Sequence, residues 1–239
     1  MSTLHTAQSL SRTEFLARVY EIAPRVAVFD CDGTLWGPDS GSAFMWWSME
    51  NGLLSPEAAA WLKQRYDRYK GGEVSELAIC SEMVQVYRGI AEKTIREAAA
   101  TFFHEQIETQ IFPEMQRLVT DLQAAGTEIW AVSSTCDWVV EEGVKRFGIE
   151  PKRVLAACVE CASGVATDRL RDVPTDEGKV AALARVGVSS PDAVFGNSIH
   201  DAAMLSIAKA PFPVNPSAEL ARLSAELGWS VYYPAAIVE

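Results

Sequence analysis

The stretch VAVFDCDGTLWGPDSG, from Val26 to Gly41, places two aspartates directly after a short apolar run. Residues 26–29 predict a parallel strand buried on both faces, because they form a continuous apolar run without polar alternation. Asp30 and Asp32 therefore lie together at the end of a buried strand, where like charges repel and burial penalises each carboxylate. Such a pair indicates a site that binds something cationic.

The sequence after Pro113 predicts an α/β fold with a doubly wound parallel sheet, because strand-like and helix-like segments alternate. Expected strands cover residues 127–134, 153–158, 192–197, 211–215 and 230–234. Expected helices cover residues 112–126, 135–148, 176–187, 198–209 and 217–228, and an amphipathic helix precedes residue 25. Residues 160–172 predict an antiparallel excursion that turns at Ser163 and Gly164.

Four helical segments interrupt this pattern, at residues 41–53, 55–72, 73–89 and 91–109. Ser55 and Pro56 are a typical helix start, and Gly71 with Gly72 is a typical stop. We therefore expect a core domain made of residues 1–37 and 113–239, with residues 38–112 forming an inserted all-helical domain.

Length and composition fit a globular protein, since 239 residues with 49% apolar side chains can form a large α/β core. A net charge of −11 argues against nucleic acid as a partner. The sequence shows neither a signal-peptide pattern nor an apolar run of membrane-spanning length, so we expect a cytoplasmic protein without a membrane partner. The sequence does not distinguish a monomer from a homodimer.

The five cysteines have no disulfide-framework spacing, and we expect reduced thiols. The CVEC segment, residues 158–161, lacks the further ligands of a zinc site. Cys31, between the two aspartates, is expected to face the core.

Three polar groups follow expected strands, where open α/β sheets place their ligands. They are Asp30-Cys31-Asp32, Ser133-Ser134, and Asn197 with Asp201. The segments DCDGTL, AVSS, DEGKVAAL with its Lys179, and GNSIHDAAML resemble, in this order, the four motifs of the haloacid dehalogenase superfamily. The helical insertion after the first motif is similar to the cap domain of the phosphoserine-phosphatase-like branch. The resemblance covers nearly the whole chain.

This resemblance implies a phosphatase that hydrolyses a small phosphomonoester through an aspartyl-phosphate intermediate. Asp30 is then the nucleophile, and Asp32 protonates the leaving group and later deprotonates the attacking water. The Ser133 hydroxyl and the Ser134 amide are expected to donate to the phosphoryl oxygens. Lys179 is expected to pair with both Asp30 and the phosphoryl group.

The resemblance also implies a Mg²⁺ cofactor, held by Asp30, the backbone carbonyl of Asp32, and the last motif. That motif has Asn197 where an aspartate is usual, so one negative charge is missing and we expect a lower metal affinity. Asp201 is expected to hold metal-bound waters or to bind the ion directly.

The cap suggests the kind of substrate. Asp39 follows Asp30 by nine residues, and in the family an acid at this place binds the ammonium of the substrate. Met83 matches the family's carboxylate-binding arginine, and Arg88 lies at least one turn away. We therefore expect a phosphomonoester with an amine and no carboxylate, similar to phosphoethanolamine or phosphocholine. A cap tryptophan or tyrosine facing the pocket could add cation–π attraction.

Other functions remain open at this point. A phosphotransferase or phosphomutase could use the same motifs, and Asn197 also permits a catalytically weakened module that only binds a metal or ligand. Dehalogenation is disfavoured because Asp32 supplies an acid that this reaction does not need. Considered one at a time, Ser133 could be an ordinary turn residue and Lys179 an ordinary solvent-exposed lysine on a helix. We expect His200 at the surface or behind the site.

Overall fold

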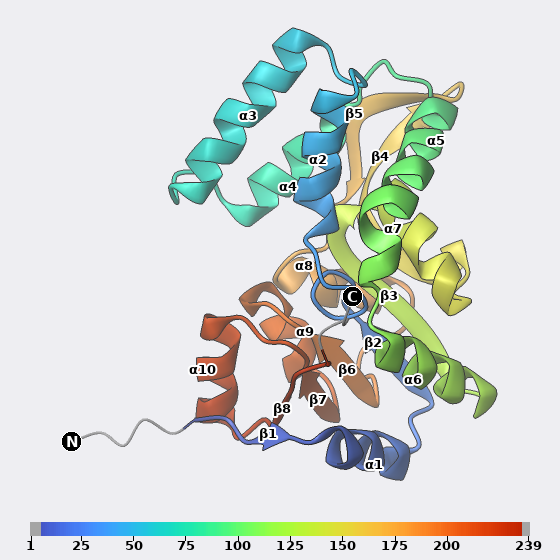
Figure 1. Ribbon diagram of the computed structural model, residues 1–239, viewed down its shortest axis with the longest axis vertical. Coiled ribbons are helices and arrows are strands. Elements are labelled where there is room, and N and C mark those ends of the chain that lie inside the picture. The colour runs from blue at the N-terminus through green and yellow to red at the C-terminus, as the bar shows by residue number, and fades with distance from the viewer. Residues whose placement is uncertain (1–5, 236–239) are drawn as a thin grey trace.

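The computed structural model describes residues 6–235, and its centre is a six-stranded sheet in the order β5-β4-β3-β2-β6-β7 (Figure 1). These strands are β2 (Val26–Phe29), β3 (Glu128–Cys136), β4 (Val154–Ala162), β5 (Val165–Asp172), β6 (Ala193–Gly196) and β7 (Ala210–Pro213). All neighbours are parallel except β4 and β5, which turn at Ser163 and Gly164. The predicted α/β fold and the antiparallel excursion are confirmed.

Helices cover both faces of this sheet. They are α1 (Arg12–Ile22), α6 (Pro113–Ala124), α7 (Asp137–Val144), α8 (Glu177–Arg185), α9 (Ala202–Ser206) and α10 (Ala218–Leu227). Along β2 the side chains alternate between two cores: Phe29 packs in one with Phe15 of α1, and Val28 packs in the other with Leu183 of α8. Burial on both faces explains why β2 is an uninterrupted apolar run.

The segment between β2 and α6 is helical, as predicted. It contains α2 (Ser40–Glu50), α3 (Pro56–Lys70), α4 (Glu76–Gln85), α5 (Glu92–Phe102), a π-helical turn (Phe103–Ile107) and a 3₁₀ turn (Glu108–Gln110). Ser55 caps α3 by accepting from the amide of Ala58, Pro56 occupies its first turn, and Gly71 follows its end. We call residues 40–110 the helical segment.

The hairpin of β4 and β5 reaches up to the helical segment (Figure 1). The amide of Ala166 in β5 donates to the carbonyl of Ile90 at 2.9 Å, and the amide of Glu92 donates to the carbonyl of Gly164 at 2.8 Å. The end of the hairpin therefore packs with residues 38–112, although its sequence belongs to the expected core. The division into a core domain and an inserted domain stays a prediction.

Two local expectations were wrong. The last strand, β8 (Val231–Tyr232), pairs in parallel with β1 (Ser9–Leu10) and meets the six-stranded sheet through an isolated parallel bridge between Tyr232 and Val214, just after β7. Packing explains this position, because the ring of Tyr232 stacks on Phe15 of α1 with centroids 4.0 Å apart. In addition, β3 extends through Cys136, so Thr135 lies in the strand and α7 begins only at Asp137.

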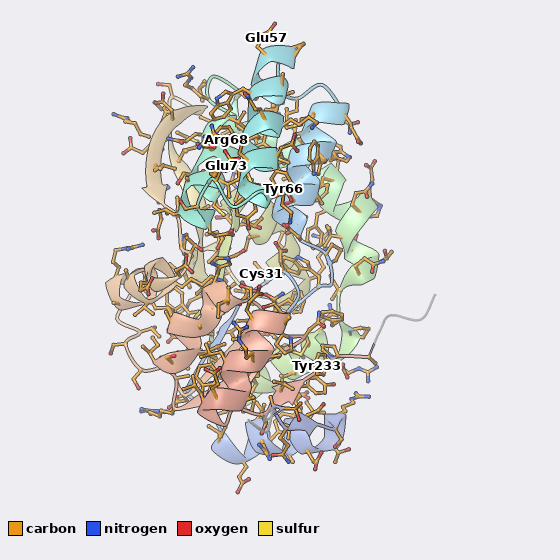
Figure 2. All side chains as sticks on the ribbon, turned by 90° about the vertical axis from the view of Figure 1, so that its left-hand side faces the viewer. Cys31, Glu57, Tyr66, Arg68, Glu73 and Tyr233 are labelled. Atoms are coloured by element: carbon orange, nitrogen blue, oxygen red, sulfur yellow. The ribbon has the colours of Figure 1, made fainter. Side chains whose placement is uncertain are left out.

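Cys31 is completely buried, as predicted, and burial raises the pKa of its thiol well above the usual value. Figure 2 shows it between Tyr66 of α3 and Tyr233. Across residues 6–235, every helix is too short or too polar to cross a membrane.

Candidate active site

The site lies where β2, β3 and β6 end side by side. Asp30 directly follows β2, Lys179 lies in the first turn of α8, and Asp201 ends a 3₁₀ turn (Ile199–Asp201) after β6. The Lys179 ammonium donates to Oδ1 of Asp30 at 2.7 Å and to Oδ1 of Asp201 at 2.5 Å. All three side chains are nearly inaccessible to solvent. Two carboxylates thus share one buried ammonium. When both carboxylates are ionised, the three groups together carry a net negative charge.

Asp201 also organises the loop after β6. Its second oxygen, Oδ2, accepts from the backbone amides of Asn197 and Ser198, both at 2.9 Å. Both oxygens of Asp201 are therefore engaged by protein donors. This carboxylate fixes Lys179 and the Asn197 loop in one arrangement.

The protonation of this array follows from burial and charge. Burial raises the pKa of Asp30, repulsion from Asp201 raises it further, and Lys179 acts against both effects. Burial alone would lower the pKa of Lys179, but Asp201 and Asp30 outweigh it and raise that pKa above its ordinary value. Lys179 is therefore positively charged at neutral pH.

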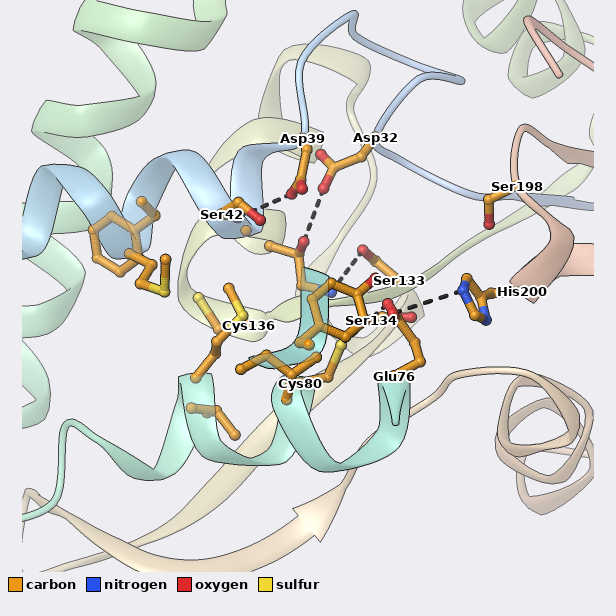
Figure 3. A pocket seen from close by; sticks show the side chains of 18 of the residues that line it. Asp32, Asp39, Ser42, Glu76, Cys80, Ser133, Ser134, Cys136, Ser198 and His200 are labelled. Carbon is orange, nitrogen blue, oxygen red and sulfur yellow. Dashed lines mark hydrogen bonds and ion pairs between the residues drawn. The ribbon is translucent and has the colours of Figure 1, made fainter. Parts of the chain in front are cut away.

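Asp32 is held by three donors. Its Oδ1 accepts from Nε1 of Trp36 and from the Ser40 hydroxyl, both at 2.5 Å. Its Oδ2 accepts from the Thr135 hydroxyl at 2.8 Å, and Figure 3 draws this bond from Asp32. Burial, followed by repulsion from Asp39, raises the pKa of Asp32 to about 6, although the three hydrogen bonds oppose this change. A carboxyl group with such a pKa can both give and take a proton near neutral pH.

The first and last motifs are in close contact at Gly33. Gly33 has a φ of +73°, and a β-carbon at this position would lie only 1.9 Å from Nδ2 of Asn197. The chain can therefore turn after Asp32, and Asn197 can approach it, only because residue 33 has no side chain. This contact brings the amide of Asn197 next to the turn that carries Asp30 and Asp32.

The oxygen atoms of this region fit a hard cation. Residues 6–235 hold no cluster of three or more His, Cys, Asp or Glu side chains in a metal-binding arrangement. Magnesium needs fewer carboxylates, because it binds through one or two of them together with waters and substrate phosphate. Asp30 and the amide oxygen of Asn197 are donors of this type, and the net negative charge beside Lys179 favours a cation.

Ser133 and Ser134, both in β3, differ in the hydrogen bonds that their hydroxyl groups make. Ser133 is buried, and its Oγ accepts from the amide of Thr135 at 3.1 Å. The hydroxyl of Ser134 donates to the carbonyl of Pro174 at 3.0 Å, so its side chain is engaged elsewhere. Both residues line the pocket, and their expected roles toward a phosphoryl group stay predictions.

One pocket is lined by the predicted residues Asp30, Asp32, Asp39, Ser133, Ser134, Lys179 and Asn197, but not by Asp201, which contacts the site through Lys179. The pocket extends into the helical segment, which contributes Tyr66, Tyr69, Glu76 and Met83. Arg88 does not line it and instead pairs with Asp168 at 3.0 Å. The pocket has no arginine, and its lysine is Lys179. Its outer part therefore lacks a permanent cation that could bind a substrate carboxylate.

Among the tryptophans and tyrosines of the expected cap, the pocket-lining residues are tyrosines. The four tryptophans Trp36, Trp46, Trp47 and Trp61 do not line the pocket, whereas Tyr66, Tyr69 and Tyr87 do. Trp36 contributes through its hydrogen bond to Asp32.

The sequence did not reveal several residues of the site. Trp36, Ser40 and Thr135 hold Asp32, and the only available signal was that the first two follow it by four and eight residues. Glu76 gave no signal at all. His200 is half-buried at the pocket and bonds to Asp176 through Nδ1 at 2.8 Å.

The chain is similar in sequence and in fold to known proteins. The family model described as haloacid dehalogenase-like hydrolase matches residues 27–206. A histidinol-phosphatase of Neisseria meningitidis is 27% identical over 217 residues, which cover 86% of this chain and 97% of that protein. Two solved structures share the fold. A protein of unknown function from Bordetella pertussis Tohama I has a TM-score of 0.74 at 23% identity, covering 87% of this chain and 97% of that one. A substrate-bound phosphoserine phosphatase has a TM-score of 0.60 at 14% identity, covering 89% of this chain and 93% of that one.

Proposed function

The chain belongs to the haloacid dehalogenase-like hydrolases, and from this premise we propose that it is a magnesium-dependent phosphatase acting through an aspartyl-phosphate intermediate. The observation that carries the proposal is the buried array of Asp30, Lys179 and Asp201. With Asp32 beside it, the array provides a nucleophile, a fixed positive charge and an acid at the same strand ends.

In the first step, a carboxylate oxygen of Asp30 attacks phosphorus, and the bond between phosphorus and the alcohol oxygen breaks. Asp32 gives its proton to the departing oxygen, so the products are a free alcohol and phosphorylated Asp30. Lys179 stabilises the negative charge on the phosphoryl oxygens. Ser133 and the Ser134 amide are proposed to donate to the same oxygens.

In the second step, water attacks the phosphorus of phosphorylated Asp30. Asp32, now ionised, removes a proton from this water, and the bond between phosphorus and the Asp30 oxygen breaks. Inorganic phosphate leaves and Asp30 is regenerated. The three donors on Asp32 support this role because they keep its carboxyl group in one orientation in both protonation states.

Asp30, the Asp32 carbonyl and Asn197 are the proposed ligands of Mg²⁺, and Asp201 holds the loop that carries Asn197. When bound, the ion neutralises negative charge between the nucleophile and the phosphate. Residues 38–112 are proposed to act as a cap over the site.

The substrate is proposed to be a small phosphomonoester with an amine and no carboxylate. Three observations support this class. Asp39 lines the pocket, and Met83 lines it at the position that matches the family's carboxylate-binding arginine. Arg88 lies outside the pocket and is paired with Asp168. The similarity to a histidinol-phosphatase points the same way, because histidinol phosphate has an amine and no carboxylate. We therefore name histidinol phosphate as the first substrate to test.

The experiment measures phosphate release from histidinol phosphate, O-phosphoethanolamine and O-phosphoserine, with Mg²⁺ and with a chelator. Release that needs Mg²⁺ and disappears in Asp30→Asn is expected, while Asp67→Asn, an exposed matched control, retains it. Mass spectrometry of rapidly quenched enzyme should find a phosphoryl group on Asp30.

Two outcomes would redirect the assignment. Transfer of phosphate to an added alcohol in preference to water would indicate a phosphotransferase. Mg²⁺ binding by the folded protein without release from any ester would indicate a binding module.

A further inference from the structure

Glu76 places a carboxylate oxygen without a partner in the pocket. It is the first residue of α4, and its side chain is 17% exposed. Its Oε1 accepts from the thiol of Cys80 at 3.4 Å. Its Oε2 is buried and has no hydrogen-bond partner within the described part of the chain. The hydroxyl of Tyr69 lies near this carboxyl group, since burial, followed by interaction with Glu76, raises the pKa of Tyr69 above its ordinary value. A buried carboxylate oxygen without a close donor costs free energy, and a ligand group that donates to Glu76 would offset this cost.

His200 does not satisfy this oxygen. Its Nε2 lies 3.6 Å from Oε2 of Glu76, which is too far for a hydrogen bond, although the two side chains face each other (Figure 3). The other ring nitrogen, Nδ1, already bonds to Asp176 at 2.8 Å. The histidine is therefore committed to another carboxylate, and Glu76 lines the pocket without a close donor to Oε2.

The charges of the pocket add to this argument. Four carboxylates line it, from Asp30, Asp32, Asp39 and Glu76. Asp30 is paired with Lys179, and Asp32 has three donors. Among the described residues, no lysine or arginine pairs with Asp39 or Glu76, and the basic group that faces Glu76 is the His200 ring, 3.6 Å away. A phosphomonoester brings further negative charge, so a ligand that supplies positive charge near these two carboxylates is favoured.

We propose that Glu76 is a specificity residue that binds a second basic nitrogen of the substrate, distal to the nitrogen bound by Asp39. The enzyme then selects phosphomonoesters with two basic groups over those with one. This inference rests on the proposed phosphatase function. Tyr66 and Tyr69 line the same end of the pocket, so a flat heterocyclic base can pack against their rings while it donates to Glu76.

The test compares L-histidinol phosphate, which has an amine and an imidazole, with O-phosphoethanolamine, which has one amine. In Glu76→Gln we expect kcat/KM for histidinol phosphate to fall at least about tenfold, mainly through KM, because a charge-assisted hydrogen bond is lost. The value for phosphoethanolamine should change little. Glu97→Gln, a matched change on α5 at an exposed position outside the pocket, should leave both values unchanged.

An equal loss for both substrates would show that Glu76 only supports the structure, and no loss would show that it does not meet the substrate. A binding measurement separates these results from a failure of the phosphatase proposal. Calorimetry with L-histidinol phosphate on Asp30→Asn and on Asp30→Asn/Glu76→Gln requires no turnover. A Kd about tenfold weaker in the double variant supports the role of Glu76 even if no ester is hydrolysed, and equal Kd values overturn it.

Discussion

The ammonium of Lys179 lies 2.7 Å from a carboxylate oxygen of Asp30, although 149 residues separate the two in the sequence. The same ammonium bonds to Asp201 at 2.5 Å. Because these side chains are almost fully buried, removal of one partner leaves uncompensated charge in the interior.

Lys179→Met is expected to lower the free energy of unfolding by about 3–5 kcal/mol, because two buried carboxylates lose their cation. Urea denaturation in the presence of a chelator measures this change. Lys63→Met, at an exposed ion pair, serves as the control and should change stability by less than about 1 kcal/mol. Adding Asp201→Asn to Lys179→Met should restore part of the stability but no activity. Wild-type stability of Lys179→Met would contradict this account of the array.

Asp32→Asn is expected to slow hydrolysis in a way that depends on the leaving group. Alkyl phosphates should lose about 10²–10⁴-fold in kcat, since their alkoxide needs a proton. p-Nitrophenyl phosphate should lose less in the first step, because its leaving group is stable as an anion. Stopped-flow measurements should therefore show a burst of nitrophenol in the variant, as phosphorylated Asp30 accumulates. Equal losses for both esters without a burst would exclude Asp32 as the acid and base.

Asn197→Asp is expected to increase the affinity for Mg²⁺, because it restores a carboxylate beside the proposed site. The Mg²⁺ concentration that gives half-maximal activity should fall several-fold, provided that the Asn197 contact with Gly33 is kept. Activity measured over a series of free Mg²⁺ concentrations tests this. An unchanged half-maximal concentration would mean that residue 197 does not contact the ion.

Met83→Arg is expected to shift specificity toward substrates with a carboxylate. The pocket has no arginine, and the new guanidinium at a pocket-lining position can bind a carboxylate through two hydrogen bonds. The ratio of kcat/KM for O-phosphoserine to that for O-phosphoethanolamine should rise. Gln85→Arg, at a helix position whose side chain bonds to the carbonyl of Asp168 outside the pocket, should leave the ratio unchanged.

Asp137→Asn is expected to make stability less dependent on pH. Burial, followed by repulsion from Glu141, raises the pKa of Asp137 to about 7, and its Oδ1 has no partner among the described residues. The folded state therefore holds this proton more tightly than the unfolded chain, whose aspartate pKa is about 3.9. Wild-type stability thus loses this contribution as pH rises from about 4 to about 7, and above that range the loss is complete.

The asparagine variant has no such proton. The free energy of unfolding of the variant minus that of the wild type should rise by about 2–3 kcal/mol from pH 5 to pH 8. Urea denaturation at both pH values measures the difference, and Asp67→Asn is the exposed control. The same difference at both pH values would show that Asp137 does not titrate in this range.

The sequence predicted those parts of the fold that depend on local pattern. The β-branched run before Asp30, the Ser55-Pro56 helix start and the turn at Ser163-Gly164 all appear where expected. The pairing of β8 with β1 was missed because it depends on the stacking of Tyr232 on Phe15, which no local pattern encodes. Thr135 was placed in a helix because its hydrogen bond to Asp32 connects residues that are distant in sequence.

In the site too, residues marked by a local sequence pattern could be predicted, whereas those placed by long-range packing could not. Asp30, Ser133, Lys179 and Asp201 could be found because each is close to the end of a strand or the start of a helix, and motif order connected them. Glu76 could not be found, because its position in the pocket depends on how α4 packs over the strand ends. Residues from the helical segment are therefore the least predictable part of the site.

The position of β2 between β3 and β6 determines when the enzyme becomes active during its synthesis. The ribosome makes the proposed nucleophile Asp30 early, but β2 can pair only after β3 and then β6 have been translated, and Lys179 and Asp201 follow Asp30 by 149 and 171 residues. A nascent chain that stalls before Asp201 leaves the tunnel carries Asp30 without its complete charge array. Such chains should therefore be inactive, however much of the helical segment they contain.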